Sequence, residues 1–497
     1  YVIPDTREGW ADSISDLIKS YEDGSETLVF DYSKIRPAGS PIKSIGGVAP
    51  GPEPLKLAHR RLRTVLDQYA RGEISPVRMV TDVVNIVGAC VVSGGQRRTA
   101  LIALGDPGDV EFANLKNYGK QNKQGEWIEQ GPSFARREWG WASNNSVVLK
   151  HEDDFAKLPE VADAIRINGE PGVLNMINIQ KYGRLTEEKH DDATLINPCG
   201  EQPLEDKEVC CLSEVYYMNN ATESQLYEAI EFATTFASMV TLLPTHNDLT
   251  NEKIFKNRRI GVSMSGVAEA IQKEPRTSMI RKLRNGYRIA QYINREHANR
   301  CGVPASVRVT TVKPSGSTSL VAGSSPGLHF PMYGRYIRRM RVQNQAPILE
   351  RLMDAGLPWE PDDYDPNSTV FEFPVNLGPI RGQKQASMYE KGDLAVDMQR
   401  HWSDNATSVT VTFDKKREGD DVEAFLADKM PYLKSISMLP ELDADDDEIT
   451  FTQHPYEEIT LKEYERRKAQ IRPIDWRNFQ QSGVELELFC DSDSCAI

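Results

Sequence analysis

Segments with the periodicity of amphipathic helices alternate along this chain with short apolar runs that are typical of strands. Apolar residues recur at helical spacing in residues 10–21, 55–69, 76–87, 226–240 and 279–293. Strand-like runs cover residues 28–30, 101–104, 307–312 and 408–413. Because strands that alternate with helices favour an α/β fold, we expect an α/β protein built as a barrel-like catalytic unit.

Length and charge limit what such a chain can do. It has 497 residues, enough for about three domains or for one large barrel-like domain with appendages. With 59 Lys and Arg against 73 Asp and Glu, the net charge is −14, which does not suit a protein that coats nucleic acid. Since no run approaches the roughly 18 apolar residues that span a bilayer, we expect neither a nucleic-acid partner nor a membrane.

The chain has seven cysteines, an odd and sparse number for its length. This usage is typical of a reducing compartment, so we expect a cytoplasmic protein with catalytic or redox thiols rather than a disulfide scaffold. Residue 1 is Tyr rather than Met, and we expect the natural N-terminus to be missing.

The stretch from Asn197 to Glu205 holds the most informative cysteine. Pro198 and Gly200 flank Cys199 and disfavour regular structure, which predicts a thiol at the tip of a rigid loop. Glu201 lies two residues further on, and a neighbouring carboxylate disfavours a thiolate. The pair therefore fits a neutral or radical hydrogen-transfer thiol beside a proton carrier, with a buried structural cysteine as the alternative.

Two further segments carry candidate chemistry. Cys490 and Cys495 lie five positions apart in a polar tail, close enough to form an exposed, easily exchanged disulfide. A zinc site is the alternative, but no nearby Cys or His pair completes four ligands, and we expect no metal. Small and hydroxyl residues follow the strand-like run 307–312 and are candidates for phosphate binding, with an ordinary loop or helix N-cap as the alternative: Ser315, Gly316, Ser317 and Thr318.

The loop that carries Cys199 resembles the active-site loop of the adenosylcobalamin-dependent (class II) ribonucleotide reductases. In that family the loop reads Asn-Pro-Cys-Gly-Glu, with a second cysteine eleven residues after the first. Cys210 follows Cys199 at that separation. Six other segments, in order from Tyr1 to the C-terminal half, resemble the same family, notably the monomeric ribonucleoside-triphosphate reductases. They are residues 4–10, 30–37, 94–98, 142–146, 259–263 and 313–317.

The resemblance implies a ten-stranded α/β barrel of two five-stranded halves around a finger loop. It also implies that Cys199 forms a thiyl radical that abstracts the ribose 3′ hydrogen, while Glu201 accepts the 3′-hydroxyl proton and Asn197 binds the sugar. Cys210 would be half of the dithiol that supplies the reducing equivalents. We therefore expect a catalytic unit over residues 1–480 and a flexible redox tail over residues 481–497, in which Cys490 and Cys495 re-reduce the internal pair.

The same resemblance implies a ribonucleoside triphosphate substrate, with a diphosphate as the alternative, a nucleotide effector, a thioredoxin-like reductant and a monomer. The partner of Cys210 is expected upstream of residues 5–10, where this chain has no cysteine. Cys90, Cys211 and Cys301 are interpreted as structural, with Cys301 in the core at a helix end.

Adenosylcobalamin is the expected cofactor, because the tyrosine pair and the glycyl-radical motif of the other reductase classes are not seen near the C-terminus. Two rival hypotheses stay open. One is a cysteine-nucleophile hydrolase that uses Cys199 with a histidine. The other is an inactive nucleotide-binding or effector subunit, or a fragment that needs a separate N-terminal segment.

Overall fold

The computed structural model describes most of the chain, namely residues 1–24, 28–40, 49–92, 99–121, 126–316, 318–344, 346, 348–363, 368–441, 453–474 and 476. The expected redox tail and Ser317 of the phosphate-binding candidate lie outside these residues, as does the motif at 94–98. No helix in the described ranges is long and apolar enough to cross a membrane.

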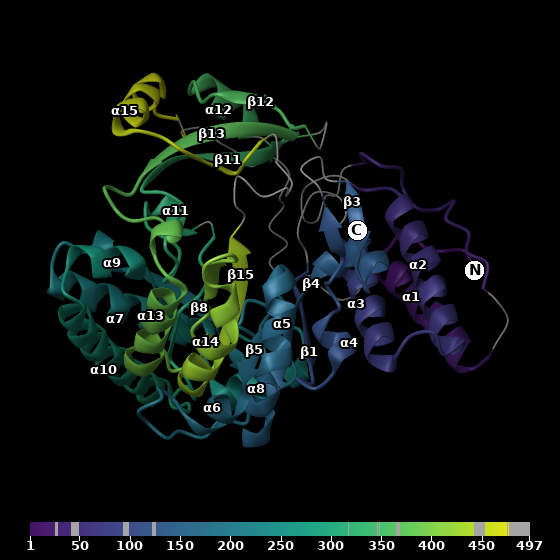
Figure 1. The fold of residues 1–497 in the computed structure, drawn as a ribbon, viewed down its shortest axis with the longest axis horizontal. Helices are drawn as coiled ribbons and strands as arrows, with labels where there is room; N and C mark the ends of the chain where they lie inside the picture. Colours follow the sequence, from purple (N-terminus) through teal and green to yellow (C-terminus); the bar gives the residue numbers. More distant parts are fainter. Residues whose placement is uncertain are drawn as a thin grey trace.

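The central sheet contains strands of two opposite directions (Figure 1). Its order is β1-β4-β5-β15-β14, and the strands are β1 (Leu101–Gly105), β4 (Ser143–Leu149), β5 (Gly172–Asn175), β15 (Ser435–Glu441) and β14 (Thr410–Asp414). The first three are parallel to one another, as are β14 and β15. The two groups meet antiparallel where Leu174 of β5 pairs with Ser435 of β15.

A second sheet continues the β14–β15 group. Its order is β10-β9-β8, all parallel, and the strands are β8 (Leu212–Tyr216), β9 (Gly261–Ser265) and β10 (Thr310–Thr311). A parallel bridge between Val312 and Thr407 joins the end of β10 to the segment that enters β14. Eight described strands thus form one group of three and one group of five.

Helices connect the parallel strands and cover their outer side (Figure 1). They are α4 (Val110–Ala113), α5 (Leu158–Asn168), α6 (Met176–Lys181), α7 (Glu223–Val240), α8 (Asp248–Asn257), α9 (Val267–Lys273), α10 (Arg276–Cys301), α11 (Thr318–Val321), α13 (Met388–His401) and α14 (Val422–Lys429). Most of these helices and the strands share one large core that includes Trp402 and Phe413, both fully buried, whereas α6 packs in a smaller cluster through Met176 and Ile179. Such packing is the usual solution for parallel strands, which are buried on both faces.

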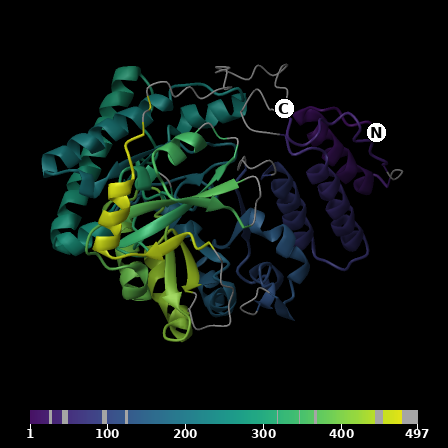
Figure 2. The same ribbon diagram turned by 90° about the horizontal axis from the view of Figure 1, so that it is seen from above.

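Three N-terminal helices form a separate body at one end of the molecule (Figures 1 and 2). They are α1 (Arg7–Glu22), α2 (Glu53–Ala70) and α3 (Pro76–Val92). Leu17, Leu55 and Leu62 are fully buried in a hydrophobic cluster distinct from the central core.

An antiparallel layer covers another side of the molecule (Figure 1). Its strand order is β12-β13-β11-β16, with α12 and α15 beside it. The elements are β11 (Arg335–Gln343), α12 (Leu349–Asp354), β12 (Trp359–Pro361), β13 (Ser368–Asn376), β16 (Tyr456–Glu458) and α15 (Leu461–Gln470). Two small hairpins complete the fold, β2 (Gly119–Gln121) with β3 (Trp127–Gln130) and β6 (Leu195–Ile196) with β7 (Pro203–Leu204).

The expected α/β class is confirmed, and the five helical patterns correspond to α1, α2, α3, α7 and α10. The ten-stranded closure stays a prediction, because the described residues contain eight of the barrel strands. The strand expected at 28–30 was wrong, since these residues are irregular and the Arg63 side chain binds the Leu28 carbonyl. The strand expected at 307–312 is regular only at Thr310–Thr311, because Asp404 instead of a neighbouring strand accepts the N–H of Val309.

Candidate active site

Cys199 lies at the tip of the hairpin formed by β6 and β7, as the loop sequence predicts. Gly200 has a φ of +81°, a left-handed conformation that favours glycine, and its N–H donates to the Asn197 carbonyl at 2.9 Å. The side-chain oxygen of Asn197 accepts the N–H groups of Glu201 (3.0 Å) and Gln202 (2.9 Å). Asn197 therefore closes the loop that presents the thiol.

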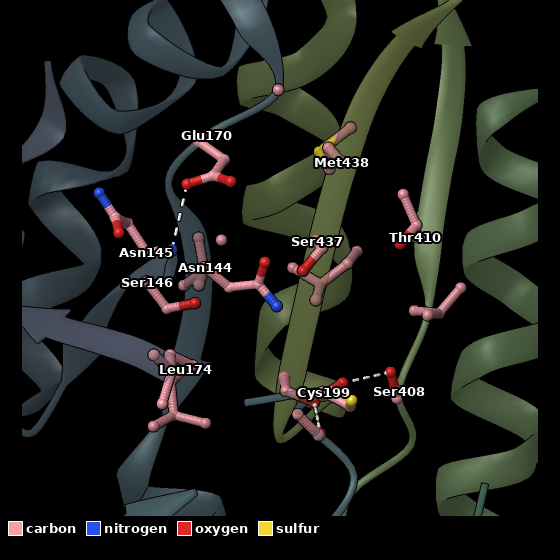
Figure 3. Close-up of a pocket in the computed structure, with 18 of the residues that line it drawn as sticks. Asn144, Asn145, Ser146, Glu170, Leu174, Cys199, Ser408, Thr410, Ser437 and Met438 are labelled. Carbon is pink, nitrogen blue, oxygen red and sulfur yellow. Dashed lines mark hydrogen bonds between the residues drawn. The ribbon is translucent and has the colours of Figure 1, made fainter. Parts of the chain in front are cut away.

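Three side chains hold the tip by its carbonyl oxygens, two from the strands β4 and β15 and one from the segment that enters β14. Asn144 Nδ2 donates to the carbonyl of Pro198 at 2.7 Å. Ser408 Oγ donates to that of Cys199 at 2.5 Å, a bond drawn in Figure 3, and Ser435 Oγ to that of Gly200 at 2.7 Å. These three contacts engage only backbone atoms of the tip.

Glu201 places a buried carboxyl group next to this tip. The residue is 3% exposed, its Oε2 has no hydrogen-bond partner, and its carbonyl accepts bonds from Thr311 Oγ1 (2.8 Å) and Ala406 N (3.0 Å). Burial raises the pKa of Glu201 above its usual range, although the Asn197 side chain and the charge of Lys313 act in the opposite direction. An acid with a raised pKa and an unpartnered oxygen is suited to exchange a proton with a bound molecule.

Cys199 also lines a cavity of about 270 Å³ between the two strand groups (Figure 3). Hydrogen-bonding side chains surround it, namely Asn144, Asn145, Ser146, Glu170, Ser408, Thr410 and Ser437. Glu170 follows Gly169, whose left-handed φ of +87° ends α5. The pKa of Glu170 is raised by burial despite an ion pair with Lys116 at 2.6 Å.

The structure brings Cys210 to the same centre. It immediately precedes Cys211 and β8 and is accessible to solvent, yet surrounding protein and the charges of Glu201 and Cys199 raise the pKa of Cys210 to about 12. At neutral pH the sulfur is therefore a protonated thiol, the form that can give up a hydrogen atom.

The other described cysteines lie elsewhere. Cys90 is buried in the N-terminal helical cluster, where burial raises its pKa to about 12. Cys211 donates to the Ala237 carbonyl at 3.3 Å, and its pKa is raised by burial to about 11. The core position expected for Cys301 was wrong: as the last residue of α10 it is exposed.

The candidate phosphate-binding residues lie close to this centre, since Pro314 lines the Cys199 cavity. Ser315 is 2% exposed, and its hydroxyl is 2.9 Å from that of Thr318. Thr318 also donates to Glu214 at 2.7 Å, and Lys313 pairs with that carboxylate at 3.0 Å. Gly316 has no heavy atom within 4 Å of where a Cβ would stand, so its backbone is open to a ligand.

Sequence reasoning missed several side chains that build the site, notably Glu170, Ser408 and Ser435. Single serines and a glutamate after a helix carry no local signal of function. Asn144 belonged to a recognised segment, but only the folded chain shows that it holds the loop tip.

The match to known proteins covers the whole chain. Residues 1–66 match a family model described as the insertion domain of B12-dependent ribonucleotide reductase. A probable adenosylcobalamin-dependent ribonucleoside-triphosphate reductase of Dictyostelium discoideum is 37% identical over 100% of this chain and 64% of its own length. The enzymes of that name from Euglena gracilis (37%, 66% of its length) and Lactobacillus acidophilus (33%, 70% of its length) also match over the entire chain. This chain belongs to the adenosylcobalamin-dependent ribonucleoside-triphosphate reductase family.

A solved structure supports the assignment. The crystal structure of a B12-dependent (class II) ribonucleotide reductase superposes with a TM-score of 0.80 at 32% identity, over 95% of this chain and 68% of that one. The resemblance inferred from the sequence is thereby confirmed. The chain spans about two thirds of the length of the curated reductases that it matches, namely 64% of the Dictyostelium protein and 66% of the Euglena protein.

Proposed function

We propose that this chain carries the catalytic site of a reductase that converts ribonucleoside triphosphates to 2′-deoxyribonucleotides through a thiyl radical on Cys199. The observation that carries the proposal is the grouping of Cys199, Glu201 and Cys210. The first is at a fixed loop tip, the second has a buried, unpartnered carboxylate oxygen, and the third is a thiol held protonated.

Each residue has a distinct role in this proposal. Cys199 abstracts the 3′ hydrogen and returns it at the end of the turnover. Glu201 accepts the 3′-hydroxyl proton while the 2′-hydroxyl leaves as water, and the raised pKa of Glu201 fits a group that also returns a proton. Asn197 fixes the loop and binds the sugar, and Cys210 supplies one of two thiols that become a disulfide.

The cavity beside Cys199 fits part of the proposed cofactor. Adenosylcobalamin, when bound, supplies the organic radical from which the thiyl radical is made. About 270 Å³ is room for a nucleoside-sized group, and Asn144, Ser146, Glu170 and Ser437 offer it hydrogen bonds. Glu201 and Cys210 are not among the residues that line this cavity, so in this proposal the sugar of the substrate binds on another side of Cys199.

Phosphate binding, partners and organisation complete the proposal. Ser315, Gly316, Ser317 and Thr318 bind the triphosphate, with Lys313 as the nearby cation. The catalytic unit spans residues 1–480, and the tail 481–497 uses Cys490 and Cys495 to re-reduce the internal pair with electrons from a thioredoxin-like protein. We further propose a monomer in the cytoplasm that responds to a nucleotide effector.

The experiment is anaerobic incubation of the chain with adenosylcobalamin, a ribonucleoside triphosphate and dithiothreitol, with deoxyribonucleotide measured by chromatography. We expect product from the parent chain, none from Cys199→Ala, and a strong loss with Glu201→Gln. Equal yields from the parent chain and Cys199→Ala would overturn the catalytic proposal. Deoxyribonucleotide that forms without adenosylcobalamin would overturn the proposed cofactor, whereas the hydrolase rival predicts cobalamin-independent hydrolysis and covalent trapping of Cys199 by an electrophile.

A further inference from the structure

A second cavity, of about 190 Å³, lies beside Cys210. It is not the cavity that Cys199 lines, and its wall is mostly apolar. The apolar lining comes from the segment before β8, the end of α7 and helix α8: Val209, Val240, Leu243, Pro244 and Ile254. Leu243 is 64% exposed, so an apolar surface next to a redox thiol is open to a partner.

The polar groups of this wall are already engaged. Glu208 accepts a bond from Arg259 Nε at 2.9 Å, and the Thr241 carbonyl accepts one from Arg258 at 2.6 Å. The Thr245 hydroxyl is 2.9 Å from Asn251 Oδ1. The cavity therefore offers a ligand only its apolar surface and the Cys210 sulfur. Such a cavity is better suited to bind an apolar group that carries a thiol than to bind a nucleotide.

The chain itself contains such a group. Phe489 directly precedes Cys490 in the tail. Because consecutive Cα atoms are about 3.8 Å apart, an anchored phenyl ring would keep the next residue's sulfur near Cys210. Phe489 lies thirteen positions after Trp476, the last described position, and thirteen extended positions can span roughly 43–47 Å. That reach exceeds the radius of gyration of about 23 Å expected for a protein of this size.

Charge also favours the tail as the occupant. Residues 485–495 contain Glu485, Glu487, Asp491 and Asp493, and no Lys or Arg. Lys207, one residue from the cavity-lining Glu208, is exposed and forms no ion pair with any described residue. An acidic segment entering at this rim meets a cation that is available to it.

We propose that the cavity beside Cys210 is a docking site for Phe489, which delivers Cys490 to Cys210 for thiol–disulfide exchange. The inference rests on the proposed redox role of the tail. Starting from a disulfide between Cys210 and a second cysteine, Cys490 attacks the Cys210 sulfur and the second cysteine leaves as a thiolate that takes up a proton. Cys495 then attacks Cys490 and releases Cys210, so two electrons pass from the tail dithiol to the internal disulfide.

The test traps the tail at the cavity as a disulfide between Cys490 and Cys210. In a Cys495→Ser background, with Cys199 and Cys301 also replaced by Ser, glutathione disulfide oxidises Cys210 and Cys490 to a cross-link and is itself reduced to two glutathione molecules. Peptide mapping by mass spectrometry follows the rate. We expect Phe489→Ala to slow the cross-link about tenfold or more, the order of effect of losing one buried aromatic side chain. Leu488→Ala, the neighbouring apolar control, keeps the parent rate.

A matched pair of variants tests the cavity. Leu243→Arg fills its mouth and is expected to slow the cross-link as much as Phe489→Ala, without a further effect when the two are combined. Leu249→Arg, at an exposed position of α8 outside the lining, serves as the control. A parent rate in Phe489→Ala, or a cross-link to Cys211 instead, would overturn the docking site.

Two results would separate this proposal from the proposed function. If no cross-link forms in the parent background while dithiothreitol supports reduction of substrate, the tail does not dock at Cys210 and the reductase proposal stands. If the cross-link depends on Phe489 but no deoxyribonucleotide forms, docking stands and the reductase proposal fails. If Leu243→Arg slows reduction by a thioredoxin-like protein in a chain without tail cysteines, the occupant is the reductant and Phe489 is refuted.

Discussion

Arg259 joins the two ends of the segment that carries the catalytic hairpin, and its replacement should be costly. Its guanidinium donates to both oxygens of Asp191, at 2.7 and 2.8 Å, and to Glu208 at 2.9 Å. All three side chains are about 1% exposed. Asp191 precedes β6 and Glu208 follows β7, so one arginine fixes both ends of the hairpin segment.

Replacing Arg259 by Gln leaves two carboxylates in the protein interior without their main cation. Breaking a buried ion pair from one side costs about 3–5 kcal/mol. Asp191 keeps Arg308 at 3.3 Å and the N–H of Ala193 at 3.1 Å, so we expect the lower end, about 3 kcal/mol. The free energy of unfolding, measured by urea titration, gives this loss directly.

The stability lost in Arg259→Gln should depend on pH. Burial raises the pKa of Asp191, but the hydrogen bonds and charge of Arg259 outweigh it and hold that pKa below its usual range. A lowered pKa contributes stability above the unfolded value of about 3.9 and loses it as pH falls through the folded value. The gap between the parent and Arg259→Gln should therefore be full at pH 7 and shrink as the pH falls toward and below about 4.

Two comparisons decide whether the reasoning holds. Arg71→Gln, which breaks the exposed pair with Glu73, should have no measurable effect. The double variant Arg259→Met, Glu208→Gln removes the arginine and its second carboxylate together while Asp191 keeps Arg308, and it should recover part of the loss. A loss below about 1 kcal/mol for Arg259→Gln, or one that does not shrink between pH 7 and about pH 3, would refute the argument.

Three further predictions follow from the site. Glu201 must be ionised to accept a proton, so product formation should rise with pH through an apparent pKa above the usual carboxyl value; a pH profile unchanged in Glu201→Gln would argue against this role. Ser408→Ala and Ser435→Ala each remove one hydrogen bond from the loop tip and should each cost about 1 kcal/mol in unfolding titrations, while lowering turnover further when combined. Because the pKa of Cys210 is about 12, iodoacetamide should alkylate it at pH 8 far more slowly than glutathione, and mass spectrometry after timed quenching would detect a normal rate as a contradiction.

Local sequence signals were sufficient wherever a short segment determines its own structure. Pro198 and Gly200 predict an irregular tip, and the structure has one, with Gly200 in the left-handed region. The helix that ends at Cys301 was expected from its periodicity, and in the structure α10 ends there, with Gly302 at a left-handed φ of +65°. The exposure of the Cys301 side chain could not be predicted this way, because it depends on which face of the helix other elements cover.

Contacts between distant segments account for what the sequence did not predict. Ser408 and Ser435 reach the loop tip from residues more than 200 positions away, and an isolated serine carries no mark of such a partner. The segment 307–312 has strand-like residues, but Asp404, nearly a hundred positions further on, takes the N–H of Val309 and limits the strand. Strand propensity is a property of one segment, whereas the length of this strand and the contacts of the two serines depend on packing against other segments.

The way the hairpin is held suits the proposed pairing of a radical thiol with a proton-accepting acid. The contacts of Asn144, Ser408 and Ser435 with the tip all end on carbonyl oxygens. These three contacts use no side-chain atom of Cys199 or Glu201, and Glu201 retains an oxygen without a partner. A loop held through the side chains of Cys199 or Glu201 would be fixed equally well, but it would have to break those bonds at each turnover.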